Sequence, residues 1–211
     1  MIQVRPTIRR AQLSDCAALA ALMRQSVHAL CVRDYSLAQI TAVTDVFGFG
    51  TLDKQLIHDE TYFVAELGGE IVGCGGWSRR IRPYSVQHDR TARRLVLPHP
   101  TPGRAAIRAI FIRPDMAGRG LGQLLVRAAE SAARKWGHDV FELTATLTGV
   151  PLYQKLAYRL HGIYSFDLPD RRRFPFALMS KTDPVNDAAY TSDACGGVAP
   201  PIGRDANLVL M

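Results

Sequence analysis

The alternation of hydrophobic and polar positions divides the chain into segments with the period of a strand or of a helix. Runs that favour extended backbone predict strands at residues 7–10, 61–67, 70–78, 107–112, 141–147, 158–168 and 174–181. Helix-period segments cover residues 14–30, 36–46 and 121–136. Ser14 and Asp15 can cap the first helix. One apolar face is predicted for the third helix, made of Leu121, Leu124, Leu125, Ala128, Ala132 and Trp136. Gly68 and Gly69 lie between two of the strand runs, which is typical of a hairpin. The mixed order of strands and helices predicts an α/β domain.

Two segments break this pattern and set the expected domain boundaries. Residues 79–104 form a basic stretch in which Pro98, Pro100 and Pro102 predict irregular backbone. Residues 183–211 are rich in Gly, Pro, Asp and Ala and have poor periodicity, which predicts a flexible tail. We therefore expect one domain over residues 1–182, with the basic stretch as an insert.

Composition and charge narrow the class of protein. The net charge of +7 is concentrated in the insert, but no nucleic-acid motif accompanies it, which argues against a nucleic-acid partner. No apolar run has the roughly 18 residues of a membrane helix, and the N-terminus lacks a signal core, so we expect a cytoplasmic protein. The four cysteines form no C-x-x-C pair and the histidines show no ligand spacing, so no metal site is expected.

The strand at 107–112 leads into a glycine loop and then directly into the helix at 121–136. Gly118, Gly120 and Gly122 alternate in this loop. Glycines allow backbone N–H groups to approach an anion, and a helix start adds unpaired donors and a partial positive charge. Strand, glycine loop and helix in this order predict a phosphate-binding site.

The spacing of the glycines discriminates between three kinds of phosphate loop. A P-loop would need Gly and Lys where Gln123 and Leu124 stand, and a dinucleotide fingerprint would need a third glycine at Gln123 or Leu125. The segment Ala117-Gly118-Arg119-Gly120-Leu121-Gly122 instead resembles the R/Q-x-x-G-x-G/A loop of the GNAT acyltransferases. Ala117 departs from the Arg or Gln usual at its first position.

Three further segments extend this resemblance over residues 7–181. Residues 111–115 (FIRPD) resemble the end of the family's fourth strand, and residues 141–147 (FELTATL) resemble its fifth. Residues 151–158 (PLYQKLAY) resemble its short tyrosine helix, with Ala157-Tyr158 in place of Gly-Phe. The resemblance implies a mixed, mostly antiparallel sheet of six to seven strands, splayed between the fourth and fifth. It also implies acetyl-CoA as co-substrate, held by Ile110, Phe111, Ile112, Ala117, Gly118, Arg119, Gly120, Leu121, Gly122, Gln123 and Tyr153.

The same resemblance implies transfer of an acetyl group to an amine, with Tyr153 assisting the thiolate leaving group. The backbone N–H of Ile112 is the expected donor to the thioester oxygen. Many relatives use a Glu on the fourth strand as base, whereas this strand has Arg108 and no carboxylate. Glu142 is one candidate base, His88, Asp89 and His99 are others, and a water chain is an alternative. Four aromatic residues are candidates for the acceptor pocket, with the protein core as the alternative: Tyr35, Phe47, Phe49 and Trp77.

Three functions stay open at this point. The first is an N-acetyltransferase acting on a small molecule or a peptide amine. The second is a non-catalytic CoA-binding or interaction module, suggested by Ala117 and by the missing carboxylate. The third is a nucleotide-dependent oxidoreductase, which the glycine spacing argues against. The acceptor is not encoded in a readable motif, and a homodimer is as compatible with the sequence as a monomer.

Overall fold

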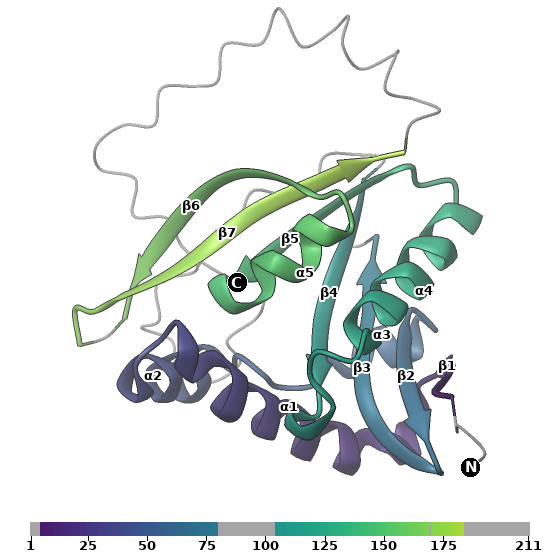
Figure 1. Cartoon of the computed structure of the whole chain (residues 1–211), viewed down its shortest axis with the longest axis horizontal. Coiled ribbons are helices and arrows are strands. Elements are labelled where there is room, and N and C mark those ends of the chain that lie inside the picture. Colours follow the sequence, from purple (N-terminus) through teal and green to yellow (C-terminus); the bar gives the residue numbers. More distant parts are fainter. Residues whose placement is uncertain (1–4, 80–103, 169, 184–211) are drawn as a thin grey trace, which may run out of the picture.

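The computed structural model describes residues 5–79, 104–168 and 170–183, with the side chains of residues 46 and 47 left out. One sheet of seven strands runs through this part of the chain in the order β1-β2-β3-β4-β5-β7-β6. All neighbouring strands pair antiparallel except β4 and β5, which are parallel. Helices cover the sheet, as Figure 1 shows. The predicted fold class, a mixed and mostly antiparallel sheet, is confirmed.

The predicted elements lie close to the observed ones. The strands are β1 (Thr7–Arg10), β2 (Tyr62–Leu67), β3 (Glu70–Ser78), β4 (Arg104–Ile112), β5 (Val140–Thr146), β6 (Arg159–Asp167) and β7 (Arg173–Thr182). The α-helices are α1 (Cys16–Leu30), α2 (Leu37–Phe47), α3 (Lys54–His58), α4 (Leu121–Lys135) and α5 (Val150–Lys155). Short 3₁₀ turns are η1 (Leu13–Asp15), η2 (Cys31–Arg33), η3 (Pro114–Met116) and η4 (Leu147–Gly149). Within the described ranges, no helix is long and apolar enough to cross a bilayer.

Each face of the sheet has its own core. On one side, here the α4 face, Ile107, Phe141 and Ala177 of the sheet pack with Val126 and Ala129 of α4. On the other side, here the α1 face, two clusters join α1 and α2 to the sheet. Their members are Leu19, Met23, Tyr62 and Cys74 in one, and Val27, Ile40, Phe174 and Phe176 in the other.

Local signals explain where the helices begin and end. The Ser36 hydroxyl accepts the N–H of Gln39 at 3.2 Å, which caps α2. Gly48, at φ 64°, ends the same helix in a left-handed conformation. Asp15 was expected to cap α1, but its carboxylate accepts the N–H of Gln12 at 2.7 Å and belongs to the preceding turn η1. The short helix α3 was not predicted, because five residues carry too little periodicity.

The buried face of α4 differs from the predicted one. Leu124 and Trp136 were expected to be buried, but they are 42% and 60% exposed. Val126, Ala129 and Ala133 are buried instead, and with them the carboxylate of Glu130. Glu130 lies outside the predicted apolar face, and Lys181 of β7 binds both of its oxygens, at 2.8 and 2.9 Å. The buried face of α4 thus includes an ion pair that cannot be seen in the sequence.

The regular pairing is interrupted on both sides of β4, in addition to single register shifts in the β2–β3 and β6–β7 pairs. Gly75 of β3 faces two residues of β4, Ala109 and Ile110, because the register shifts between Cys74 and Gly76. Ala109 has φ 53°, which side-chain-bearing residues rarely adopt. Towards β5, the pairing runs from Arg104 to Ala106 and stops. Beyond it, β4 continues to Ile112 and β5 to Thr146 as what we call the unpaired β4–β5 segment.

The insert at residues 80–103 and the tail at residues 184–211 lie outside the described residues. The expected irregular insert, flexible tail and single domain over residues 1–182 stay predictions.

The buried carboxylate of Glu130 gives a stability prediction. Glu130→Gln should lower the free energy of unfolding by about 2–4 kcal/mol, because it leaves the Lys181 ammonium without its counter-charge in the core. The matched control is Glu60→Gln, which removes an exposed ion pair with Arg10 and should cost less than about 1 kcal/mol. Urea unfolding of the three proteins measures both values. Equal losses in the two variants would contradict a structural role of the buried pair.

Candidate active site

The loop between β4 and α4 has an open backbone. Gly118 and Gly120 have φ values of 77° and 84°, so both lie in the left-handed region that favours glycine. A Cβ atom at either position would meet nothing within 4 Å. Because both residues are glycines, no side chain fills the space over the loop at these positions, and the backbone N–H groups are accessible there.

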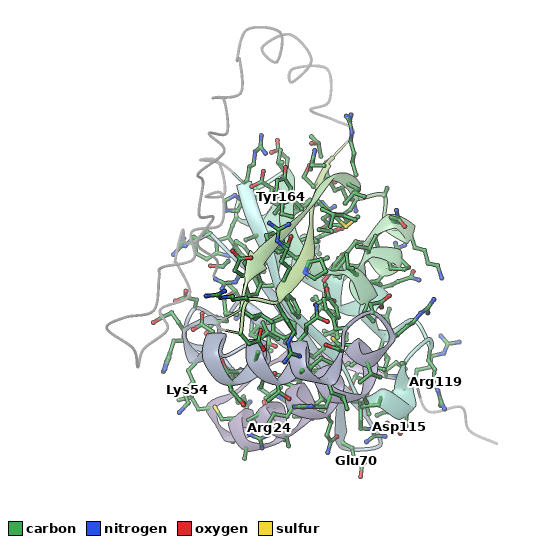
Figure 2. The ribbon with its side chains drawn as sticks, turned by 90° about the vertical axis from the view of Figure 1, so that its left-hand side faces the viewer. Arg24, Lys54, Glu70, Asp115, Arg119 and Tyr164 are labelled. Atoms are coloured by element: carbon green, nitrogen blue, oxygen red, sulfur yellow. The ribbon has the colours of Figure 1, made fainter. Side chains whose placement is uncertain are left out.

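The N-terminus of α4 lies at the end of this loop and carries no side-chain cap. Its N-cap residue is Gly120, which has no side chain to accept the N–H groups of the first turn. These donors and the positive end of the helix dipole meet the needs of a phosphate. Arg119, the one charged side chain of residues 117–122, is exposed and points away from the ribbon in Figure 2. The loop residues thus fit the pyrophosphate of CoA.

Two contacts fix the loop on either side. Before it, the Arg113 guanidinium binds Asp115 at 2.7 Å and Glu70 at 2.8 Å, and this pairing holds the pKa of the Asp115 carboxyl below its usual value. After it, Gly122 brings α4 close to α5, since a Cβ there would lie 2.9 Å from Leu152 Cδ2. The third glycine therefore has a role in helix packing.

The direction of the N–H groups in β4 follows from one measured bond. Arg113 donates its N–H to the Val72 carbonyl of β3 at 2.9 Å. Successive N–H groups of a strand point to opposite sides, so those of Ile112 and Ile110 point away from β3, towards β5. The N–H of Ile112, predicted to contact the thioester, donates to the Ser26 hydroxyl of α1 at 3.3 Å. Ile110 follows Ala109 directly in the unpaired β4–β5 segment.

Tyr153 lies in α5, beyond the end of β5. Its side chain is 8% exposed and packs edge-on against Tyr158, with 5.7 Å between the ring centroids. Burial raises the pKa of the Tyr153 phenol well above its usual value near 10. The phenol is therefore protonated throughout the neutral range and can donate a proton but not accept one.

The junction between β5 and α5 is tied to the α1 face by Tyr35. The Tyr35 hydroxyl accepts the N–H of Leu147 and donates to the carbonyl of Pro175, both at 2.7 Å. Its ring stacks on Phe174 at 4.3 Å. Next to it, the Thr148 hydroxyl donates to Asp34 at 2.7 Å. Tyr35 was predicted as a pocket candidate, but it is 4% exposed and has a supporting position.

The other aromatic candidates divide between surface and core. Phe49 is half-buried and lies 6.1 Å from the ring of Phe111, on the α1 face. Trp77 is 1% exposed and belongs to the core of the α4 face. The core, which was the alternative to the acceptor pocket, is therefore its observed position. Only the backbone of Phe47 is described.

Glu142 is the one candidate base among the described residues, and it lies outside the unpaired β4–β5 segment. Glu142 forms an ion pair with the Arg104 guanidinium. It is the ladder partner of Ala106, at the start of the strands, where β4 and β5 still pair. His88, Asp89 and His99 lie outside the described residues. Among the residues that are described, no group of three or more His, Cys, Asp or Glu side chains could hold a metal ion.

Two residues that shape the site at β4 were missed by the sequence reasoning. Ser26 is a polar residue at the helical spacing of the buried positions Leu22 and Met23, and this exception could have marked it. Gly75 provides the space for the bulge, because a Cβ there would lie 2.2 Å from Ile110 Cδ1. Two adjacent glycines inside a strand run, Gly75 and Gly76, are the signal that could have marked this position.

Comparison with solved structures finds the same fold. A GCN5-related N-acetyltransferase from Rhodopseudomonas palustris superposes with a TM-score of 0.62 at 20% identity, covering 86% of this chain and 98% of that one. PaiA N-acetyltransferase from Thermoplasma acidophilum, in complex with coenzyme A, gives 0.57 at 14% identity, with 84% and 99% covered. YncA from Salmonella typhimurium, a putative acetyltransferase with its cofactor acetyl-CoA, gives 0.55 at 16% identity, with 84% and 94% covered.

Sequence comparison gives the family. No curated protein sequence matches the chain. A sequence model of the acetyltransferase (GNAT) family matches residues 25–158, which contain the glycine loop, the unpaired β4–β5 segment and Tyr153. Acetyl-CoA is the co-substrate that goes with this family and with the loop geometry. The chain belongs to the GNAT family of acetyltransferases.

Proposed function

We propose that the protein is an N-acetyltransferase that moves the acetyl group of acetyl-CoA to the amine of a small molecule or a peptide. The observation that carries this proposal is the unpaired β4–β5 segment, with the glycine loop at the end of one strand and Tyr153 beyond the end of the other. An extended thioester can lie between strands that no longer bond to each other.

The chain holds the co-substrate mainly through its backbone. The N–H groups from Gly118 to Gln123 bind the pyrophosphate, as the left-handed glycines and the uncapped α4 allow. Ala117 contributes its backbone alone, and the exposed Arg119 adds positive charge. When bound, acetyl-CoA supplies an activated acetyl group on sulfur.

The N–H of Ile110 stabilises the thioester oxygen. It points to the β5 side of β4, as does that of Ile112, but the Ile112 N–H already has the Ser26 hydroxyl as acceptor. We therefore assign the role predicted for Ile112 to Ile110. A fixed donor at this oxygen is most effective in the transition state, where negative charge gathers on it.

The transfer exchanges a C–S bond for a C–N bond. The amine nitrogen attacks the thioester carbon, the C–S bond breaks, and Tyr153 gives its proton to the leaving thiolate. The amine gives up one proton, and water returns one to Tyr153, so that the products are an amide and free CoA thiol. No carboxylate of β4 is available, and Glu142 is engaged by Arg104, so the proton of the amine passes to water.

A glycine substitution in the loop tests the co-substrate site. Acetyl-CoA should raise the unfolding midpoint of the wild type, since it binds the folded state, while NAD should not. Gly120→Val should lose this shift, because its side chain would fill the space over the loop.

The control for this variant is Gly69→Val in the β2–β3 turn. Gly69 has φ 83° and also has no neighbour within 4 Å of a Cβ, so the backbone strain matches, about 1–3 kcal/mol in each variant. Gly69→Val should keep the full shift. A shift retained in Gly120→Val would exclude the loop as the site, and no shift in the wild type would favour a structural role without the co-substrate.

Replacing Tyr153 tests the acid. Tyr153→Phe should lower kcat by about 10²–10⁴-fold while acetyl-CoA still shifts the midpoint. Tyr158→Phe, which removes a second buried phenol that packs against the first, should keep most of the activity. Because burial raises the pKa of Tyr153, kcat of the wild type should not fall with rising pH below about pH 10. Full activity of Tyr153→Phe in a free-thiol assay would remove the acid role.

A further inference from the structure

The Ala109–Ile110 peptide of β4 is held by a side chain that comes from two strands away. The strands β2, β3 and β4 lie side by side in the sheet, as Figure 1 shows. Tyr62 is the first residue of β2, and its hydroxyl donates a hydrogen bond to the carbonyl of Ala109 at 2.8 Å. Tyr62 is 0% exposed and belongs to the core cluster of α1 and the sheet. The bond therefore crosses β3 on the α1 face.

Two glycines of β3 make this crossing possible. Tyr62 faces Gly76 in the β2–β3 ladder. A Cβ at Gly76 would lie 2.8 Å from Tyr62 Cδ2, so the ring takes the space that a side chain would need. Gly75 leaves room for Ile110 in the same way, since a Cβ there would lie 2.2 Å from Ile110 Cδ1. The adjacent glycines thus admit both the tyrosine ring and the bulge that it holds.

The Tyr62 hydroxyl fixes more than the carbonyl that it binds. The Ala109 carbonyl and the Ile110 N–H belong to one planar, trans peptide group, so they point in opposite directions. Holding the oxygen on the side of Tyr62 turns the N–H away from β2 and β3, towards the unpaired β4–β5 segment. Ala109 has φ 53°, a conformation that persists only where its surroundings support it. The direction of the Ile110 N–H, inferred above from Arg113, thus follows from a second bond as well.

The same bond strengthens the Ile110 N–H as a donor. A carbonyl that accepts a hydrogen bond polarises its peptide group, and bonds in such a chain strengthen one another by about 10–30% each. The Cys74 thiol lies beside the same hydroxyl, and burial raises the pKa of this thiol to about 12, so it stays protonated at neutral pH. A thiol sulfur is a weak acceptor, so the hydroxyl proton belongs to the Ala109 carbonyl.

We propose that Tyr62 is a positioning residue of the active site, which holds the Ala109–Ile110 peptide so that the Ile110 N–H meets the thioester oxygen of acetyl-CoA. The proposal rests on the proposed N-acetyltransferase function, in which Ile110 is that donor. Tyr62 lies on the carbonyl side of the peptide and acts through Ile110 without touching the substrate. A donor that is fixed before the substrate binds needs no reorganisation when negative charge gathers on the oxygen.

Acetyl-CoA labelled with ¹³C at the thioester carbonyl reports on this donor without any acceptor amine. A hydrogen bond to the oxygen draws electrons from the carbonyl carbon, so the ¹³C resonance of the bound thioester should lie downfield of that of free acetyl-CoA. Tyr62→Phe keeps the ring and removes the hydroxyl. It should lose about 30% of this displacement or more, while acetyl-CoA still raises the unfolding midpoint as in the wild type.

Turnover should show the same split between binding and catalysis. With an amine that the wild type acetylates, kcat of Tyr62→Phe should fall about 3- to 10-fold, the effect of one hydrogen bond, at an unchanged KM for acetyl-CoA. A residue that only supported the fold would not change the spectrum of the bound thioester.

Thr61→Val is the matched control. The Thr61 hydroxyl is buried, next in sequence, and donates to the carbonyl of Leu56 at 3.3 Å, so this bond takes no part in β4. Both variants leave a buried carbonyl without its hydroxyl partner, and both should lower the unfolding midpoint. Thr61→Val should nevertheless keep the full displacement of the ¹³C resonance.

A second substitution changes the bond without removing it. 3-Fluorotyrosine in place of Tyr62 keeps the hydroxyl and nearly the same volume, and the fluorine makes the phenol a stronger donor. The displacement of the ¹³C resonance should then exceed that of the wild type. This substitution tests the proposal even where the loss of the hydroxyl prevents folding.

Each contrary result has a distinct meaning. A displacement that is unchanged in Tyr62→Phe, or that does not grow with 3-fluorotyrosine, would overturn the positioning role and leave the N-acetyltransferase function in place. Equal losses in Tyr62→Phe and Thr61→Val would assign the effect to a general loosening of the core and overturn the role too. Acetyl-CoA that binds the wild type without any displacement would remove Ile110 from the proposed mechanism, and no binding would refute the proposed function itself.

Discussion

The interrupted hydrogen-bond ladder of β4 is the constraint on which the rest of the structure depends. Two residues of β4 face Gly75, and the left-handed backbone of Ala109 makes room for the extra one. The arrangement favours a glycine on β3, because a Cβ at position 75 would lie 2.2 Å from Ile110 Cδ1 and would displace that side chain. Its result is a strand that pairs with β5 at its start and leaves N–H groups without a strand partner at its end.

The surrounding contacts hold this unpaired segment in shape before any ligand arrives. Tyr35 binds Leu147 where β5 ends, Gly122 lets α4 and α5 meet, and Ser26 accepts the N–H of Ile112. Donors that are fixed in advance need little reorganisation when charge develops on the substrate. The family match and these contacts thus both point to the unpaired β4–β5 segment.

The glycine loop and the strands could be predicted from the sequence because they depend on local chemistry, whereas Tyr153 was singled out by the resemblance to the GNAT family. Alternating glycines before an amphipathic helix are readable without tertiary structure, and so is a hairpin around Gly68 and Gly69. The buried face of α4 was predicted wrongly, since burial of Glu130 depends on Lys181, which is distant in the sequence. The partners of Ile112 and Glu142 were equally hidden, as each is set by a residue on another element.

The most direct test of the account is the response of individual backbone amides to acetyl-CoA. In ¹⁵N-labelled protein, the amide shifts of Ile110–Ile112 and Gly118–Gln123 should change most on titration, because in the proposed site the thioester lies against the end of β4 and the pyrophosphate against the loop. The amides of the β2–β3 turn at Gly68 and Gly69 should stay unchanged. Shifts that leave both of the first two segments unaffected would contradict the central claim that the broken ladder of β4 and the glycine loop form one acetyl-CoA site.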